Sequence, residues 1–133
     1  MSNIDKQALR EAANAANTAS WGNWEPYKPH KGARGYEVKV GLKAVAQHCL
    51  KVDSVFIAAA NPATVLALLD ELEAKDKRIA ELSASHGKLR EAMAGIHNTI
   101  RSEGVYTPLA AILNASKRAY EESAAAAAKG EAS

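Results

Sequence analysis

The residue types that carry most enzyme chemistry are few and scattered in this chain of 133 residues. The one cysteine, Cys49, follows His48, and these are the residue types of a thiol nucleophile and its base. Adjacent residues of a strand point to opposite faces, so we interpret them as a buried thiol and a surface imidazole. Metal ligands of CxxC type, a phosphate-binding glycine loop and a nucleophile elbow are all missing. We therefore predict no enzymatic activity, no catalytic residue, no cofactor and no metal.

A basic and aromatic segment is the other place where residue types suggest chemistry. Residues 18–52 contain six basic residues against Glu25 and Glu37, a local net charge of +4, together with four of the seven aromatic residues. Cations interleaved with aromatic rings can bind single-stranded nucleic acid by phosphate attraction and base stacking. The same residues also suit a small core with a solvated loop, or a protein-binding surface. The candidate partner or nucleic-acid surface comprises Lys28, Lys31, Arg34, Lys39, Lys43 and Lys51.

The composition limits the core that the chain can form by itself. Alanine supplies 29 residues, whereas Phe, Trp and Tyr together supply seven. Alanine favours helix but buries little apolar surface, so we expect a mainly α chain that borrows surface from a second copy. The formal net charge is only +2, and no apolar run approaches the ~20 residues of a transmembrane helix. With one cysteine and no signal-like N-terminus, these features predict a cytoplasmic protein without membrane contact.

The first part of the chain, residues 1–61, is typical of a small α+β module that begins with a helix. Ser2 and Asp5 match a capping box, in which two side chains satisfy the first amide donors of a helix. Apolar residues at helical spacing follow, so we expect this helix over residues 3–17.

The rest of this module is predicted to contain strands and a short helix. Residues 36–40 alternate apolar and polar side chains, which is typical of a half-buried strand, and residues 24–27 are expected to pair with it. Residues 44–50 fit a third strand or a helical turn, and we favour the strand. Asp53 then has the chemistry of an N-cap, which predicts a short helix over residues 54–60.

A heptad pattern dominates residues 62–123, which we interpret as a coiled-coil helical hairpin that mediates oligomerisation. Asn61 and Pro62 suit the cap and first residue of a new helix. From Val65 the register steps by three and four residues over five heptads, which keeps one seam facing a partner helix. The alternative is a surface helix on a globular core, but a helix of about 36 residues spans roughly 54 Å, more than this chain can cover. The predicted oligomer interface comprises Val65, Leu68, Leu69, Leu72, Lys75, Ile79, Leu82, His86, Leu89, Met93, Ile96 and Ile100.

Two polar positions interrupt this seam. Lys75 and His86 could fix the register and the oligomeric state, or Lys75 could reach outward while His86 contacts a neighbouring helix or water. In a parallel dimer Glu71 would face Asp76, so we favour an antiparallel pair or a larger bundle.

A second helix is expected to return along the first. The long helix should end near residues 102–104, and Thr107 and Pro108 should open the next. Two such hairpins would form a four-helix bundle. Residues 124–133 form an alanine-rich tail that we expect to be flexible. The residues predicted to pack within the hairpin are Leu109, Ile112, Leu113 and Tyr120.

The chain resembles the Ead-type (Ead/Ea-like) family of phage early-region proteins, found in lambdoid phages and prophages. The resemblance is carried by the stretch from Asp53, DSVFIAAANPATVLALLDELEAKDKRIAELSAS. It extends to the opening AANTASWGNWEPY, whose turn differs from the usual Pro-Gly-Pro-Trp-like one, and to the C-terminal GIHNTIRSEGVYTPLAAILNASKRAYEES. The resemblance implies a small cytoplasmic protein with a coiled-coil portion, associated with host takeover and the lytic–lysogenic balance, and without enzymatic residues.

These observations predict a non-enzymatic phage or prophage early accessory protein. We expect a homodimer or homotetramer that acts by protein–protein interaction with a host protein, in host takeover, lysis–lysogeny balance or counter-defence. The alternative is a nucleic-acid-binding regulator that uses the basic aromatic segment, residues 21–51.

Overall fold

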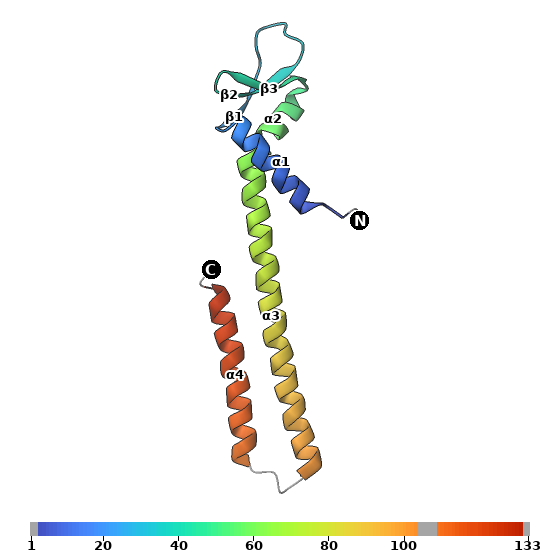
Figure 1. Cartoon of the computed structure of the whole chain (residues 1–133), viewed down its shortest axis with the longest axis vertical. Coiled ribbons are helices and arrows are strands. Elements are labelled where there is room, and N and C mark those ends of the chain that lie inside the picture. The colour runs from blue at the N-terminus through green and yellow to red at the C-terminus, as the bar shows by residue number, and fades with distance from the viewer. Residues whose placement is uncertain (1–2, 104–108, 132–133) are drawn as a thin grey trace. The chain divides into compact units, whose positions relative to one another are not determined.

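The computed structural model describes residues 3–103 and 109–131, and there the fold is mainly α with a small α+β module, as the sequence predicted. A sheet of short strands lies between the first two helices along the chain (Figure 1). By its internal contacts the chain divides into two compact units, residues 1–72 and residues 73–133. The elements are α1 (Lys6–Ala19), β1 (Trp24–Tyr27), β2 (Tyr36–Val40), β3 (Lys43–Cys49), α2 (Lys51–Ala59), α3 (Pro62–Glu103) and α4 (Leu109–Glu131).

Helix α1 begins later than the capping-box pattern predicted. Its N-cap is Asp5, whose side chain accepts a hydrogen bond from the Ala8 N–H at 2.9 Å, so the helix starts at Lys6. Ser2, the expected first partner of the box, lies outside the described residues. The helix continues to Ala19 because its alanine-rich second half favours helix.

The three strands form an antiparallel sheet in the order β1-β2-β3. The predicted strands over residues 24–27 and 36–40 are confirmed, and the segment that fitted either strand or helix is strand β3. Val38, at the centre of β2, is fully buried, and α2 packs on the sheet with its Ser54 and Ala58 buried. This small core is the reason that the N-terminal module holds together.

The two helix starts that follow the sheet were predicted with different success. Helix α2 begins at Lys51 and has Leu50 at its N-cap, so the prediction of Asp53 as a cap is wrong. Asp53 lies in the first turn instead, where a carboxylate interacts favourably with the helix dipole. At the start of α3 the Thr64 N–H donates to Asn61 Oδ1 at 3.0 Å, which confirms Asn61 as the cap and Pro62 as the first helical residue.

The first turns of α3 belong to the N-terminal unit. Leu69 is buried there, and Arg10 of α1 donates to Asp70 Oδ1 at 2.7 Å. The division between the units therefore lies within α3, whereas the boundary that we expected near residue 61 coincides with the turn between α2 and α3.

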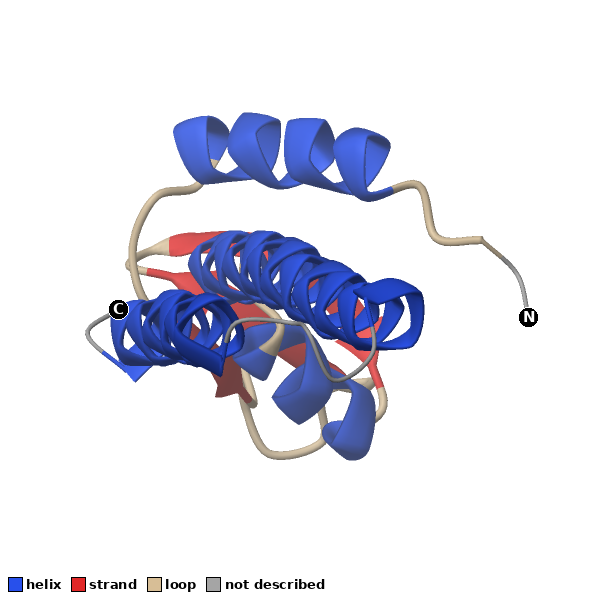
Figure 2. Cartoon of the chain, turned by 90° about the horizontal axis from the view of Figure 1, so that it is seen from below, coloured by secondary structure: helices blue, strands red, loops and turns tan. Residues whose placement is uncertain are grey.

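In the second unit, α4 runs antiparallel beside α3, and the two helices lie side by side in both views (Figures 1 and 2). Helix α3 ends at Glu103, as expected, while the predicted opening of the next helix at residues 107–108 lies outside the described residues. Helix α4 is continuous to Glu131, although we expected a flexible tail from residue 124. Alanine propensity favours this helix, and Arg78 of α3 donates to the Ala127 carbonyl at 3.2 Å near its end.

None of the described helices is by itself long and apolar enough to cross a membrane. Taken together, α2 and α3 have the length and the apolar composition of a membrane span. They are bent by 53° at the break between them, and no single helix of the described residues has both properties.

Candidate functional site

The residues that resembled a nucleophile and its base make separate contacts. The Cys49 thiol donates to the Gln47 carbonyl at 3.7 Å, and His48 Nδ1 lies 3.3 Å from the Arg34 carbonyl oxygen. His48 has a φ of 60°, a conformation that non-glycine residues rarely adopt, so β3 is irregular here. Within residues 3–103 and 109–131, no three His, Cys, Asp or Glu side chains converge on a possible metal position.

The basic residues of the candidate surface are distributed over a loop, two strands and a helix. Lys28 and Lys39 lie over the rings of Tyr36 and Tyr27, with their ammonium groups 5.4 Å and 4.3 Å from the ring centroids. Lys43 donates to the Ala19 carbonyl at 3.1 Å at the end of α1. Three of the six cations, namely Lys28, Lys39 and Lys43, thus contact groups of their own module. The remaining members of the candidate surface are Lys31, Arg34 and Lys51.

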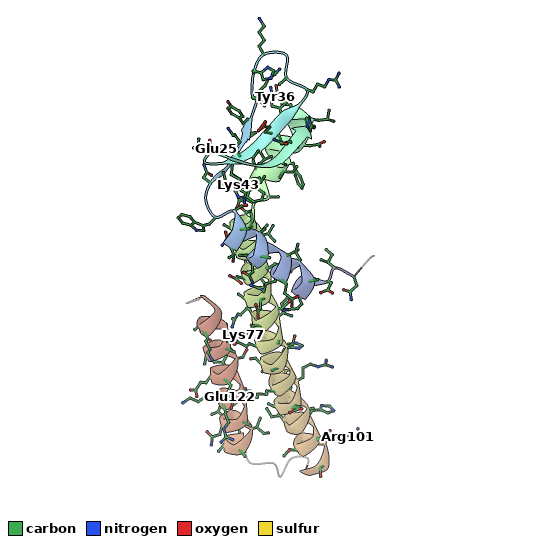
Figure 3. All side chains as sticks on the ribbon, turned by 45° about the horizontal axis from the view of Figure 1, so that its top comes forward. Glu25, Tyr36, Lys43, Lys77, Arg101 and Glu122 are labelled. Atoms are coloured by element: carbon green, nitrogen blue, oxygen red, sulfur yellow. The ribbon has the colours of Figure 1, made fainter. Side chains whose placement is uncertain are left out.

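A groove of about 760 Å³ brings part of this surface together, and it carries both signs of charge. Lys39 and Lys43 line it with Tyr27 and the largely exposed Trp21, but Glu25 lines it too (Figure 3 labels Glu25 and Lys43). Glu25 lies directly opposite Lys39 in the β1–β2 pairing. The groove offers rings for stacking, yet Glu25 offsets one of its two lysines and leaves a net charge of only +1.

The apolar seam of α3, defined as the twelve residues of the predicted oligomer interface, is mostly exposed. Leu69 is buried, Val65, Leu89 and Ile96 are half-buried, and the remaining eight residues are exposed. Among these, Leu68, Ile79 and Met93 are each about 60% exposed. A row of large apolar side chains at heptad spacing therefore faces away from the chain's own core.

Helix α4 covers a stripe of α3 that lies next to the seam and shares Leu89 and Ile96 with it. The contact includes the Arg78–Ala127 hydrogen bond, and Leu89 and Ser85 line a groove together with Ala119 and Ala126. The half-buried residues of α3 in this region are spaced by three and four positions. They form the α4-facing stripe, which comprises Arg78, Glu81, Ser85, Leu89, Ala92, Ile96 and Thr99.

The residues expected to pack within the hairpin are mostly not its contacts. Ile112 is half-buried, but Leu109, Leu113 and Tyr120 are 78%, 66% and 73% exposed. Small residues make the contact instead, because they allow two helix backbones to approach closely. The α3-facing stripe of α4 comprises Ile112, Ala115, Ala119, Ser123, Ala126 and Gly130.

Sequence reasoning also missed an exposed apolar face on α2. Val52, Val55 and Phe56 are each at least half exposed, and Leu50 precedes them. Their spacing of three and four residues was a visible signal, but the short helix was placed too late in the chain to include Val52.

Comparison with known families gives one result. The family model described as Ead/Ea22-like protein matches residues 2–132, nearly the whole chain. Searches of curated proteins and of solved structures give no match.

Proposed function

The chain belongs to the Ead/Ea22-like protein family, which indicates a phage early-region protein, and from this premise we propose that it is a non-enzymatic accessory protein that assembles with copies of itself. In this proposal the seam of α3 joins the copies, as a homodimer or homotetramer in the cytoplasm of the bacterial host. The assembly then presents several N-terminal modules to a host protein.

The exposed seam of α3 is the observation that carries the proposal. Its apolar residues keep a heptad register, and most of them stay exposed beside the stripe that α4 covers, which shares only Leu89 and Ile96 with the seam. Fully burying a Leu or Ile side chain contributes about 1.5–3 kcal/mol, so an exposed row of them favours association. Contiguous apolar patches on an exposed surface are typical of sites of protein contact.

Multivalency supports the part of the proposal that concerns the host protein. Linked binding modules raise the overall affinity without any new contact, so each module can bind weakly. The exposed residues of α2 and the cations around the β1–β2 loop are the surfaces of the module that a host protein can reach.

Light scattering of the full-length protein tests assembly, with Ile79→Glu and Ala80→Glu as a matched pair. Both positions are exposed and adjacent on α3, and both variants gain the same charge, but only Ile79 lies in the seam. We expect an oligomeric mass for the wild type and for Ala80→Glu, and a monomeric mass for Ile79→Glu. A wild type that stays monomeric at all concentrations would overturn the proposal.

The alternative function is binding of single-stranded nucleic acid through the basic aromatic segment. The groove with Trp21, Tyr27 and Lys39 supports it, while Glu25 opposes it. If several lysines contacted phosphates, the affinity for single-stranded DNA would fall steeply with salt, which tryptophan fluorescence can measure. Absence of binding at low salt would exclude this alternative.

A further inference from the structure

We propose that α4 forms part of the interface between copies, so that two hairpins pack face to face as a four-helix bundle. This inference rests on the proposed function, in which copies of the chain associate through the seam of α3. It adds that the occupant of the exposed face is the hairpin of a second copy, and that Leu109, Leu113 and Tyr120 contact it.

The first step is the position of the seam on α3. The α4-facing stripe includes Arg78, Glu81 and Ser85, and the seam residues Ile79, Leu82 and His86 each follow one position later. Leu89 and Ile96 belong to both the stripe and the seam. One residue corresponds to about 100° of rotation around a helix of 3.6 residues per turn. The seam therefore lies on one side of the hairpin, next to the contact with α4.

The second step is the position of the large apolar residues on α4. Leu113 and Tyr120 also follow one position after contact residues, namely Ile112 and Ala119. Leu109 precedes Ile112 by three residues. Three residues backwards are about −300° around the helix, which is the same position as +60°, so Leu109 is displaced in the same rotational sense. Viewed from one end, antiparallel helices turn in opposite senses and their contact stripes point in opposite directions. The same displacement therefore leads to the same side of the hairpin on both helices.

The third step is the register between the helices, which places these residues beside the seam. Arg78 contacts Ala127, and Leu89 and Ala119 line the same groove, so residue numbers rise on α3 as they fall on α4. This register places Tyr120 near the level of Leu89 and Leu113 near that of Ile96. The exposed apolar residues of the two helices thus form one face two helices wide.

The opposite side of the hairpin has a different character. A groove of about 410 Å³ opens there between the helices, and Figure 3 labels Glu122, one of its residues. None of the seam residues except Leu89 lines this groove. Its charged lining residues are Arg78, Glu81, Lys88, Glu122 and Lys129. The large exposed apolar residues of the hairpin therefore gather on one side, and the charged residues that line the groove lie on the other.

A second copy fits this apolar face in extent and in character. Residues 79–100 of α3 rise about 33 Å, and two helices are about 20 Å wide, which gives roughly 650 Å² of face. A stable interface buries about 800 Å² on each partner, so the area of this face approaches what a stable dimer needs. Two-fold symmetry places the same patch on both partners, so the apolar residues of one face meet those of its own copy.

Light scattering of full-length Leu113→Glu and Asn114→Glu tests the inference. Both residues are exposed on α4, but only Leu113 lies on the apolar face. We expect Leu113→Glu to weaken association at least ten-fold and Asn114→Glu to leave it unchanged. Tyr120→Glu serves as a second variant on the face, and circular dichroism of all three verifies that they remain helical.

The possible outcomes separate this inference from the proposed function. If the wild type is oligomeric and both Leu113→Glu and Tyr120→Glu associate as tightly as it does, α4 lies outside the interface and the inference is overturned. The α3 seam then still joins the copies. If the wild type is monomeric, the proposed function itself fails, and the inference fails with it.

Discussion

Gly35 occupies a position in the N-terminal module that no other residue fits well. Its φ is +85°, and a Cβ atom there would lie 2.9 Å from the Cys49 carbonyl oxygen, where the loop after β1 closes onto β3. Glycine alone combines the left-handed conformation with this close approach. Nearby Gly32 has a similar φ of +91°, but a Cβ there would have no atom within 4 Å.

We expect Gly35→Ala to lower the free energy of unfolding by about 2–3 kcal/mol, because backbone strain and a clash add up. Gly32→Ala is the matched control and should cost only about 1 kcal/mol, since strain acts there without the clash. Urea titration followed by tryptophan fluorescence measures both values. Equal losses in the two variants would show that the contact with Cys49 adds nothing.

At the scale of elements, Asn61 links the end of α2 to the start of α3. Its Oδ1 accepts from the Thr64 N–H, and its Nδ2 donates to the Ala58 carbonyl, both at 3.0 Å. We expect Asn61→Ala to lower the free energy of unfolding by about 1–2 kcal/mol, because both helix ends lose a partner. The measurement is chemical denaturation followed by circular dichroism.

Asp53→Ala is the comparison for that experiment, because Asp53 had the sequence signature of a cap but lies within the first turn of α2. Only its interaction with the helix dipole is lost, which costs about 0.5 kcal/mol. A larger loss from Asp53→Ala than from Asn61→Ala would contradict the assignment of the two caps.

The strands could be predicted from the sequence because their pattern is local. Val38 and Val40 alternate with polar residues, and this period of two requires no knowledge of the partner strand. Helix starts were harder, since Leu50 caps α2 through its extended backbone rather than through a side chain. A search for capping side chains therefore selected Asp53.

The contact stripes of the hairpin could not be predicted from hydrophobicity. We assigned the contact to Leu109, Leu113 and Tyr120 because large side chains bury more apolar surface. Ala119 is buried instead, because a small residue lets the helices approach closely. Nothing in a single sequence shows whether a large apolar residue packs within its own chain or against a second copy.

At the scale of the whole molecule, assembly is expected to depend on pH through His86. This residue lies about one turn from the middle of the seam, so it faces the His86 of a second copy in a parallel pair and lies about 10 Å along the axis from it in an antiparallel pair. Histidine changes its charge between about pH 5 and 8, and protonation places like charges in an apolar interface. We therefore expect acidification to disfavour the oligomer.

We expect the dissociation constant of the wild-type oligomer to rise several-fold between pH 7.5 and pH 5.5, measured by light scattering over a dilution series. His86→Leu should associate more tightly and lose most of this dependence, because the seam becomes apolar there. His30→Gln, which changes a histidine of the β1–β2 loop, should retain it. If His86→Leu weakened as much as the wild type on acidification, other groups would control the pH response and His86 would not lie between the copies.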